Sequence, residues 1–355
     1  MKSFETARGA VLVFVLLVIA MLSAVMVETL NRLSADSVLA SNRVNRAQAR
    51  ENAETALVLA LRTLAEDRYE TANDTLSDDW NSFPDPDMLQ SFDINTADIG
   101  GTITDEGGLI PLNDIATSEE IAGVFIRLLT NTPFSLQQEK AENLCDAIRD
   151  WVDGNDDPRS ETSPAEDNFY QSRELPYHCK NGTFDALDEL LLVRGMTAAL
   201  YFDHNGRPGL QRYLTIHSKG KININTAPLP VLAALPSDME GLRAEEFAQD
   251  IDAFRRSKLN KDQLDDTGWF REELTRYADV ELPDASLTTT ADIFRLRVFG
   301  TSGTAKAGIN VVVQRTAKPS STDEDKKDVV FTILERWVDP IPKSLQTSAT
   351  SDETS

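Results

Sequence analysis

An unbroken apolar run near the start of the chain dominates its hydrophobic pattern. From Ala10 to Val27 every residue is apolar except Ser23. As a helix rising about 1.5 Å per residue, ~18 residues nearly cover a hydrocarbon layer about 30 Å thick. A cleavable secretory signal needs a shorter apolar stretch and a small-x-small cleavage site, and residues 22–24 (Leu-Ser-Ala) make a poor one. We therefore predict a helix that spans a membrane and is retained.

The helical pattern continues well beyond this run. The sequence has no glycine between Gly9 and Gly100, and its first proline is Pro84. Apolar residues recur mostly three, four or seven positions apart as far as Leu64, with arginine, asparagine and glutamate between them. We predict one helix to about Ala65, roughly 80 Å long, with an oily first third and an amphipathic remainder.

Short strands and then helices are predicted for the middle of the chain. Residues 92–114 combine β-branched residues, glycine and turn formers, which indicates short strands. The expected strand residues are Thr102, Ile103, Leu109, Ile110 and Leu112. Two helices should follow, one starting with a capping box at Ser118 and one running from a Ser135 cap to Gly154. Helical patterns continue to about Tyr277, so we expect a helical insertion.

Alternating patterns return near the end of the chain. Residues 291–303, 307–316 and 328–339 alternate and are separated by turn-rich segments, which predicts an antiparallel meander. We expect these strands to pair with the 100–112 region and to pack on the long helix. The tail after Pro340 has no core pattern.

The charge of the chain limits its partners. It has 58 acidic residues against 35 lysines and arginines, a formal net charge of -23. Such a surface should be repelled by nucleic acid and by anionic lipid, whereas it suits divalent cations and a soluble body outside the cytosol. The two cysteines, Cys145 and Cys179, would be free buried thiols in a reducing cytosol. For an exported body we expect them to form a disulfide.

One loop concentrates this charge. Residues 150–167 hold seven acidic side chains and Asn155, and the aromatic residues Trp151, Phe169 and Tyr170 flank them. Like charges in a loop held at both ends repel each other unless a cation joins them, and carboxylate and carbonyl oxygens suit calcium. The spacing is not that of an EF-hand, and a solvated acidic loop remains the alternative.

The chain carries little that indicates catalysis. Its three histidines lack ligand spacing, "GTSGT" is not a nucleophile elbow, and phosphate-binding glycine loops are absent from the sequence. Residues 223–236 resemble half of a helix-hairpin-helix but lack its Gly-x-Gly phosphate cradle. We expect Val231, Leu232 and Leu235 to pack in a helical bundle, and we expect no enzyme.

The beginning of the chain resembles type IV pilins and type II secretion pseudopilins, because a short basic leader ends in Gly9 just before the apolar helix. This resemblance implies that a prepilin peptidase cuts between Gly9 and Ala10 and that Ala10 becomes the methylated N-terminus. Most such proteins carry glutamate at the fifth mature position, where this chain has Phe14. Its absence is typical of the K-type minor pseudopilin. A subunit without this acid needs no cationic neighbour within the lipid, so it can end a fibre.

Four further blocks resemble the K-type family in the same order. They are "DWVDGNDDP" (150–158), "AED" (165–167), "FDALDELLLVRGM" (184–196) and "KININTAP" (221–228). The resemblance implies an α+β, pilin-like fold, in which a long N-terminal helix packs on an antiparallel sheet and a large all-α domain is inserted. The implied parts are a leader (1–9), the transmembrane part of the helix (10–28), the first part of the pilin-like domain (29–113), the inserted helical calcium-binding domain (114–285), the C-terminal pilin-like strands (286–340) and a disordered tail (341–355).

The family's structural calcium is carried over to this chain by resemblance. The implied ligands are Asp153, Asn155, Asp157, Glu161, Glu166 and Asp167. The chain departs from the family at Asn155, where aspartate is frequent, and at Pro164, where glycine is frequent, so a weaker site or one ion fewer is expected.

The resemblance implies a minor pseudopilin at the tip of the periplasmic pseudopilus that supports protein export. It would be a single-pass inner-membrane protein with its bulk in the periplasm. The implied partners are the I, J and H minor pseudopilins, the major pseudopilin, the inner-membrane assembly platform and exported substrate, but not nucleic acid. The alternatives are a DNA-binding competence protein of pseudopilin type and a calcium-dependent envelope hydrolase.

Overall fold

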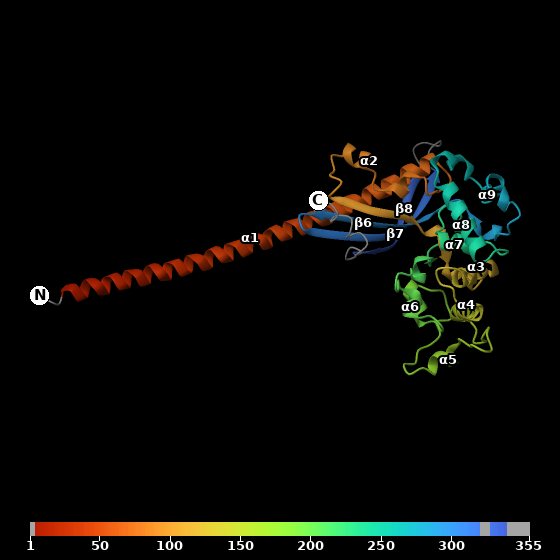
Figure 1. Ribbon diagram of the computed structural model, residues 1–355, viewed down its shortest axis with the longest axis horizontal. Helices are drawn as coiled ribbons and strands as arrows, with labels where there is room; N and C mark the ends of the chain where they lie inside the picture. Colours follow the sequence, from red (N-terminus) through yellow and green to blue (C-terminus); the bar gives the residue numbers. More distant parts are fainter. Residues whose placement is uncertain (1–3, 320–326, 339–355) are drawn as a thin grey trace.

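A single long helix determines the shape of the molecule. The computed structural model describes residues 4–319 and 327–338. Helix α1 (Phe4–Glu70) has 67 residues, and its first part projects alone from the rest of the chain (Figure 1). The helix continues about one turn beyond the expected end near Ala65, because no glycine or proline occurs in it after Gly9. The first three leader residues and the tail from residue 339 lie outside the described residues.

A four-stranded sheet packs on the second half of α1. Its strands are β1 (Ile99–Asp105), β6 (Ile293–Ser302), β7 (Ala305–Pro319) and β8 (Lys327–Trp337), in the order β1-β6-β7-β8, and every pairing is antiparallel. The predicted meander and its pairing with the 100–105 segment are confirmed, and so is the α+β, pilin-like fold.

Small residues allow α1 to lie close against the sheet. Ala49, Ala53, Ala56 and Ala60 are fully buried along one face of the helix. Opposite them, a Cβ at Gly300 of β6 would overlap the backbone of Ala49 and Ala53, so only glycine fits this crossing. The side chains that close this core, such as Trp80 and Phe294, come from the segment after α1 and from the strands.

A second core lies in the helical part of the chain, which occupies the end of the molecule away from the N-terminus (Figure 1). It is built on α3 (Glu119–Thr130), α4 (Gln138–Val152), α7 (Leu229–Ala234) and α8 (Leu242–Arg255). The smaller elements are α2 (Pro86–Ser91), α5 (Asp167–Gln171), α6 (Ala198–Tyr201), α9 (Trp269–Glu273), the strands β2 (Ile110–Pro111), β3 (Leu214–Thr215), β4 (Ile222–Asn223) and β5 (Leu287–Thr288), and the 3₁₀ helices η1 (Asp79–Ser82), η2 (Glu106–Gly108), η3 (Leu112–Ile115), η4 (Leu187–Leu192), η5 (Leu210–Arg212), η6 (Lys258–Gln263), η7 (Thr275–Tyr277) and η8 (Asp284–Ser286).

Two local predictions were wrong. Leu109 follows the 3₁₀ helix η2 and Leu112 begins the 3₁₀ helix η3, so neither is a strand residue. Strand β2 between them pairs in parallel with β3 rather than with the sheet. Ser135 does not cap α4, because its φ of 50° lies in the left-handed region, whereas an N-cap is extended. Gln137 is the N-cap residue instead. The Ser118 cap is confirmed, since its hydroxyl accepts a hydrogen bond from the Ile121 N–H at 3.3 Å.

Candidate functional site

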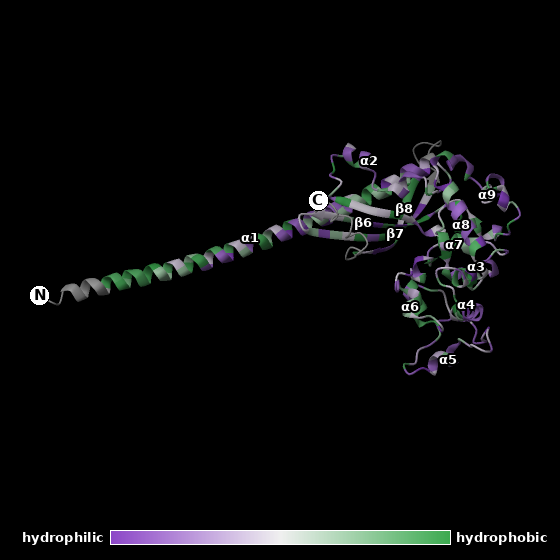
Figure 2. Cartoon of the chain, in the orientation of Figure 1, coloured by the Kyte–Doolittle hydropathy of each residue, from purple (hydrophilic) through white to green (hydrophobic). Residues whose placement is uncertain are grey.

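The free part of α1 is the most exposed apolar surface of the protein. Between Val11 and Val27 the large side chains are all strongly exposed, for example Phe14 at 66 %. Figure 2 shows this stretch as an almost continuous hydrophobic segment. None of the most apolar part of α1 is buried in the protein. By length and composition α1 is suited to a single-pass membrane anchor. Among the described helices it is the one that is long and apolar enough to cross a membrane.

Apolar residues also remain exposed beyond the anchor. Leu30, Leu33, Val38 and Val44 are each more than half exposed, on a stretch that also carries charged pairs such as Arg32 and Glu28, 2.8 Å apart. Such a helix can pack against other helices outside the lipid through its apolar positions.

The acidic loop connects α4 to α5 and contains a buried carboxylate without a partner. Glu166 is 3 % exposed, and neither of its carboxylate oxygens has a hydrogen-bond partner among the described residues. Burial, together with the charges of Asp150, Asp153, Asp156 and Asp157, raises the pKa of Glu166 to about 7. Asp150 is fully buried, with one carboxylate oxygen accepting from the Arg159 N–H at 3.1 Å and the other unpartnered.

The structure brings some of the expected ligands together and engages others elsewhere. Asp153 ends α4 and has Arg159 3.7 Å away, and the Asn155 side-chain oxygen accepts from the Asp157 N–H at 2.8 Å. The carboxylate of Asp167 instead accepts from the backbone of Cys179 at 3.0 Å and lies 3.1 Å from the His178 ring.

Glu161 is exposed and makes no hydrogen bond or ion pair in the described part of the chain. As they stand, no three acidic, histidine or cysteine side chains of the described residues are close enough together to hold a metal ion. The fit to a cation therefore depends on the unpartnered oxygens of Glu166 and Asp150, which a hard cation among these acids would satisfy. Calcium binding would require the loop to draw its exposed acids inward.

Asp150 was missing from the expected ligands. A signal was present, because Asp150 lies in the last turn of α4 and Asp153 is the residue that follows the helix. Acidic side chains are unfavourable at the negative end of a helix dipole, so two of them at this end already indicate a compensating cation.

Aromatic side chains hold the loop at both ends, as the sequence indicated. The rings of Trp151 and Tyr170 meet edge to face with centroids 5.2 Å apart, and those of Phe169 and Tyr170 are 5.1 Å apart. Cys145 and Cys179 are both buried and unbonded. The disulfide between them stays a prediction.

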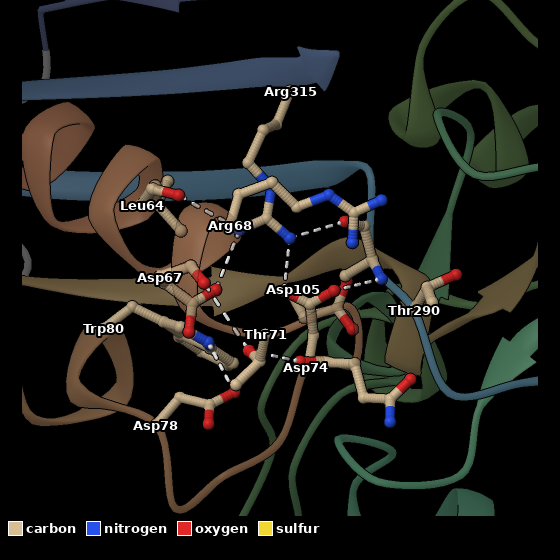
Figure 3. A network of polar contacts seen from close by, with 12 residues as sticks. Leu64, Asp67, Arg68, Thr71, Asp74, Asp78, Trp80, Asp105, Thr290 and Arg315 are labelled. Atoms are coloured by element: carbon tan, nitrogen blue, oxygen red, sulfur yellow. Dashed lines mark hydrogen bonds and ion pairs between the residues drawn. The ribbon is translucent and has the colours of Figure 1, made fainter. Parts of the chain in front are cut away.

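A buried polar network joins the sheet to the helical part (Figure 3). Arg315 of β7 is 1 % exposed in its side chain and donates to the Leu64 carbonyl at 3.1 Å, to Asp67 at 2.9 Å and to Asp74. Its guanidinium also donates to the Ala291 carbonyl at 2.9 Å. The end of α1, the following loop and the entry to β6 are therefore tied to one side chain.

Asp105 extends this network into the "KININTAP" segment. Its carboxylate accepts from Thr226 at 2.6 Å, from Asn223 at 3.0 Å and from the Gly107 N–H at 2.6 Å. Burial raises the pKa of Asp105 to about 7. Burial, with the charges of Asp78 and Asp74, raises the pKa of Asp67 to about 7 as well. The sequence block thus fastens the helical part to the end of β1.

The three histidines and the helix-hairpin-helix-like segment do not form a further site. His178 contacts Asp167, His204 contacts Asn205, and His217 lies 3.5 Å from Glu335, so the three histidines have separate partners. In the helix-hairpin-helix-like segment, the packing interpretation is confirmed by burial. Val231, Leu232 and Leu235 are all fully buried.

Comparisons with known proteins agree with this architecture. Residues 92–204 match the family model described as type II secretion system (T2SS), protein K. The chain is 30 % identical over 203 residues to type II secretion system protein K of Klebsiella pneumoniae, covering 55 % of this chain and 60 % of that protein. It is 29 % identical over 165 residues to the Pseudomonas aeruginosa protein of the same name, covering 43 % of this chain and 47 % of that one. The matches thus span about half to three fifths of these relatives' lengths.

A solved structure has the same fold. A chain of the GspK-GspI-GspJ complex from the enterotoxigenic Escherichia coli type 2 secretion system superposes with a TM-score of 0.54 at 19 % identity, covering 86 % of this chain and 99 % of that one. The family model covers the motifs at residues 150–158, 165–167 and 184–196, whereas the motif at 221–228 lies outside the matched range. Over part of its length, the chain is thus similar to the type II secretion system protein K family, and it shares the fold of a chain from the GspK-GspI-GspJ complex.

Proposed function

We propose that this protein is a minor pseudopilin that ends the periplasmic pseudopilus of a type II secretion system and supports protein export. One observation carries the proposal. The continuous helix α1 has an exposed apolar segment at its N-terminal end, and the bulky folded head is packed on its other end. Such a helix is stable only in lipid or among similar helices. We place the anchor in the inner membrane and the head in the periplasm.

The tip position is supported by both ends of the molecule. Residues 10–27 of the anchor include no acidic residue, so the anchor places no demand for a cationic neighbour above it in the bundle. The inserted helices extend sideways from the far end of α1 (Figure 1), where they would obstruct a subunit stacked above. A subunit with both features is suited to the end of a fibre and not to its interior.

The proposed partners follow from this position. The related fold was solved in a complex with GspI and GspJ, and we propose the I and J types as direct neighbours here. Below them we propose the H type, the major pseudopilin and the inner-membrane assembly platform, and above them exported substrate. The net charge of -23 argues against nucleic acid as a partner.

Two further features are proposals of the same kind. A prepilin peptidase would cut between Gly9 and Ala10 and leave a methylated Ala10. A structural calcium ion would be held by Asp153, Asn155, Asp157, Glu161, Glu166 and Asp167, with Asp150 added from its burial beside them. Calcium would supply positive charge that relieves the repulsion among these acids and would hold the loop in place. A disulfide between Cys145 and Cys179 would restrain the same region. The support is the unpartnered, buried carboxylate of Glu166.

The assembly role is tested by co-expression with I- and J-type pseudopilins from the same genome, followed by native mass spectrometry in detergent. We expect one copy of each in a complex. A matched pair of variants tests the uncharged anchor. Phe14→Glu adds a charge that costs about 2.5 to 3.5 kcal/mol in the centre of a bilayer when nothing pairs with it, whereas Phe14→Gln adds only polarity.

We expect Phe14→Glu to lower pseudopilus assembly and secretion more than Phe14→Gln. A chain recovered without either partner, or a Phe14→Glu variant that assembles better than the wild type, would contradict the tip position. A competence protein would bind DNA at low salt, and a hydrolase would lose activity on substitution of one acid while remaining folded.

A further inference from the structure

A basic pocket lies in the helical part, on the side of α4 that faces the α6 segment. It has a volume of about 410 Å³ and is lined by three cationic residues, Lys140, Arg194 and Arg207, and by apolar side chains that include Leu136, Leu144 and Leu200. None of the described residues that line it is acidic. In a chain with a net charge of -23, this is a local reversal of sign.

Both arginines are held in place by their surroundings. The Arg194 guanidinium lies 4.2 Å from the centroid of the Phe169 ring and donates to the Pro164 carbonyl. The Arg207 guanidinium lies 5.4 Å from the centroid of the Phe134 ring and donates to the Ala199 carbonyl. A guanidinium has five N–H donors, so each retains donors for a ligand. Such fixed forks lose little side-chain entropy on binding.

Lys140 differs from the two arginines. It lies on the exposed face of α4, and its ammonium makes no hydrogen bond or ion pair in the described part of the chain. It can therefore turn toward an anion in the pocket without breaking an existing contact.

We propose that this pocket binds a carboxylate attached to a small apolar group. Planar guanidinium donors match a carboxylate in two-point hydrogen bonding, and the leucine side chains match an apolar body. The volume lies within the usual range of small-ligand sites, about 300 to 1,000 Å³. A phosphate dianion fits less well, because it has no apolar part and is repelled more strongly by the acidic surface.

Two sources share this chemistry, the C-terminus of a peptide and a free organic acid. The pocket uses none of the proposed calcium ligands and no part of α1, so its test does not depend on the proposed function.

The test is isothermal titration of the full-length protein in a non-ionic detergent, with four probes. They are 3-phenylpropionate, its amide, acetyl-Ala-Phe with a free carboxylate, and the same dipeptide amidated. We expect the free carboxylates to bind with Kd on the order of 0.1 to 1 mM and the amides at least tenfold more weakly. The amides also report uptake by the detergent.

Matched variants locate the site. Lys140→Gln and Arg194→Gln should each weaken carboxylate binding severalfold, whereas Arg243→Gln should not, because Arg243 is exposed on α8 away from the pocket lining. All three remove one positive charge, so a general electrostatic effect would weaken binding equally. Lys140 has no partner to lose, so its variant remains informative even where Arg194→Gln fails to fold.

The outcomes separate the two sources. Binding of both carboxylates supports a pocket that accepts either source. Binding of the dipeptide alone supports a peptide C-terminus as the ligand, and binding of 3-phenylpropionate alone supports a free organic acid. Equal binding of acids and amides, equal loss in all three variants, or tighter binding of inorganic phosphate than of either carboxylate would overturn the proposal.

Discussion

Replacing Arg315 by methionine should be strongly destabilising. The Arg315 side chain is 1 % exposed and compensates the charges of Asp67 and Asp74, which are 6 % and 1 % exposed in their side chains. Methionine is apolar and of similar length, but it removes the guanidinium that lies 4.6 Å from the centroid of the Phe294 ring. It also removes every donor to the two carboxylates and to the Leu64 and Ala291 carbonyls.

The expected magnitude follows from the burial of both acids. Removing one member of a buried ion pair costs about 3 to 5 kcal/mol, because the other charge remains buried without compensation. Asp74 would keep one donor, the Ala291 N–H at 2.7 Å, so we expect the lower half of this range. The assay is urea unfolding of the full-length chain in detergent, followed by tryptophan fluorescence, since Trp80 lies fully buried in the same core.

Two further variants test the reasoning. Arg336→Met removes the exposed ion pair between Arg336 of β8 and Glu54 of α1, and it should cost no more than about 1 kcal/mol. Arg315→Met combined with Asp74→Asn removes one of the uncompensated charges and should recover part of the loss. A loss below about 1 kcal/mol for Arg315→Met, or a double variant no more stable than the single one, would refute the proposed role of the network.

Three other predictions concern packing, pH and metal. Gly300→Ala should lower the free energy of unfolding by about 1 to 3 kcal/mol in the urea assay, because its Cβ overlaps α1, whereas Gly154→Ala, with open space around it, should change little. The free energy of unfolding should fall as pH rises from about 4 to 7, because the folded chain keeps a proton on Asp105 up to a pKa of about 7 while the unfolded chain releases it near 3.8. Asp105→Asn should flatten a pH series, and an unchanged slope would show that Asp105 does not titrate there. Removing calcium with a chelator should lower the thermal midpoint, and Glu166→Gln should blunt that response; a midpoint that the chelator leaves unchanged would exclude a structural metal.

The parts of the fold with strong periodicity were predictable from the sequence. Helix α1 has no glycine or proline after Gly9, and the strands β6, β7 and β8 alternate between turn-rich segments. The start of α4 was misplaced because Ser135 has the right chemistry for a cap but the wrong backbone angle, which depends on the turn around it. Residue type alone does not determine that angle.

The candidate sites were predictable to different degrees. The acidic loop can be recognised in the sequence from its local charge, and the anchor can be recognised from its local hydropathy. The Arg315 network joins residues up to 251 positions apart, and no local pattern indicates that Arg315 of β7 meets Asp74. The basic pocket is likewise assembled from α4, the residues after η4 and the loop after α6, each of which carries only one of the three cations.

The most direct test is the mass of the N-terminal peptide of the chain, isolated from membranes of cells that contain the prepilin peptidase. We expect a peptide that begins at Ala10, carries one methyl group on its amine and continues into the apolar segment. Recovery of the chain with Met1 intact, or of a head that has lost residues 10–28, would contradict a pseudopilin that is cut in front of its anchor and retained.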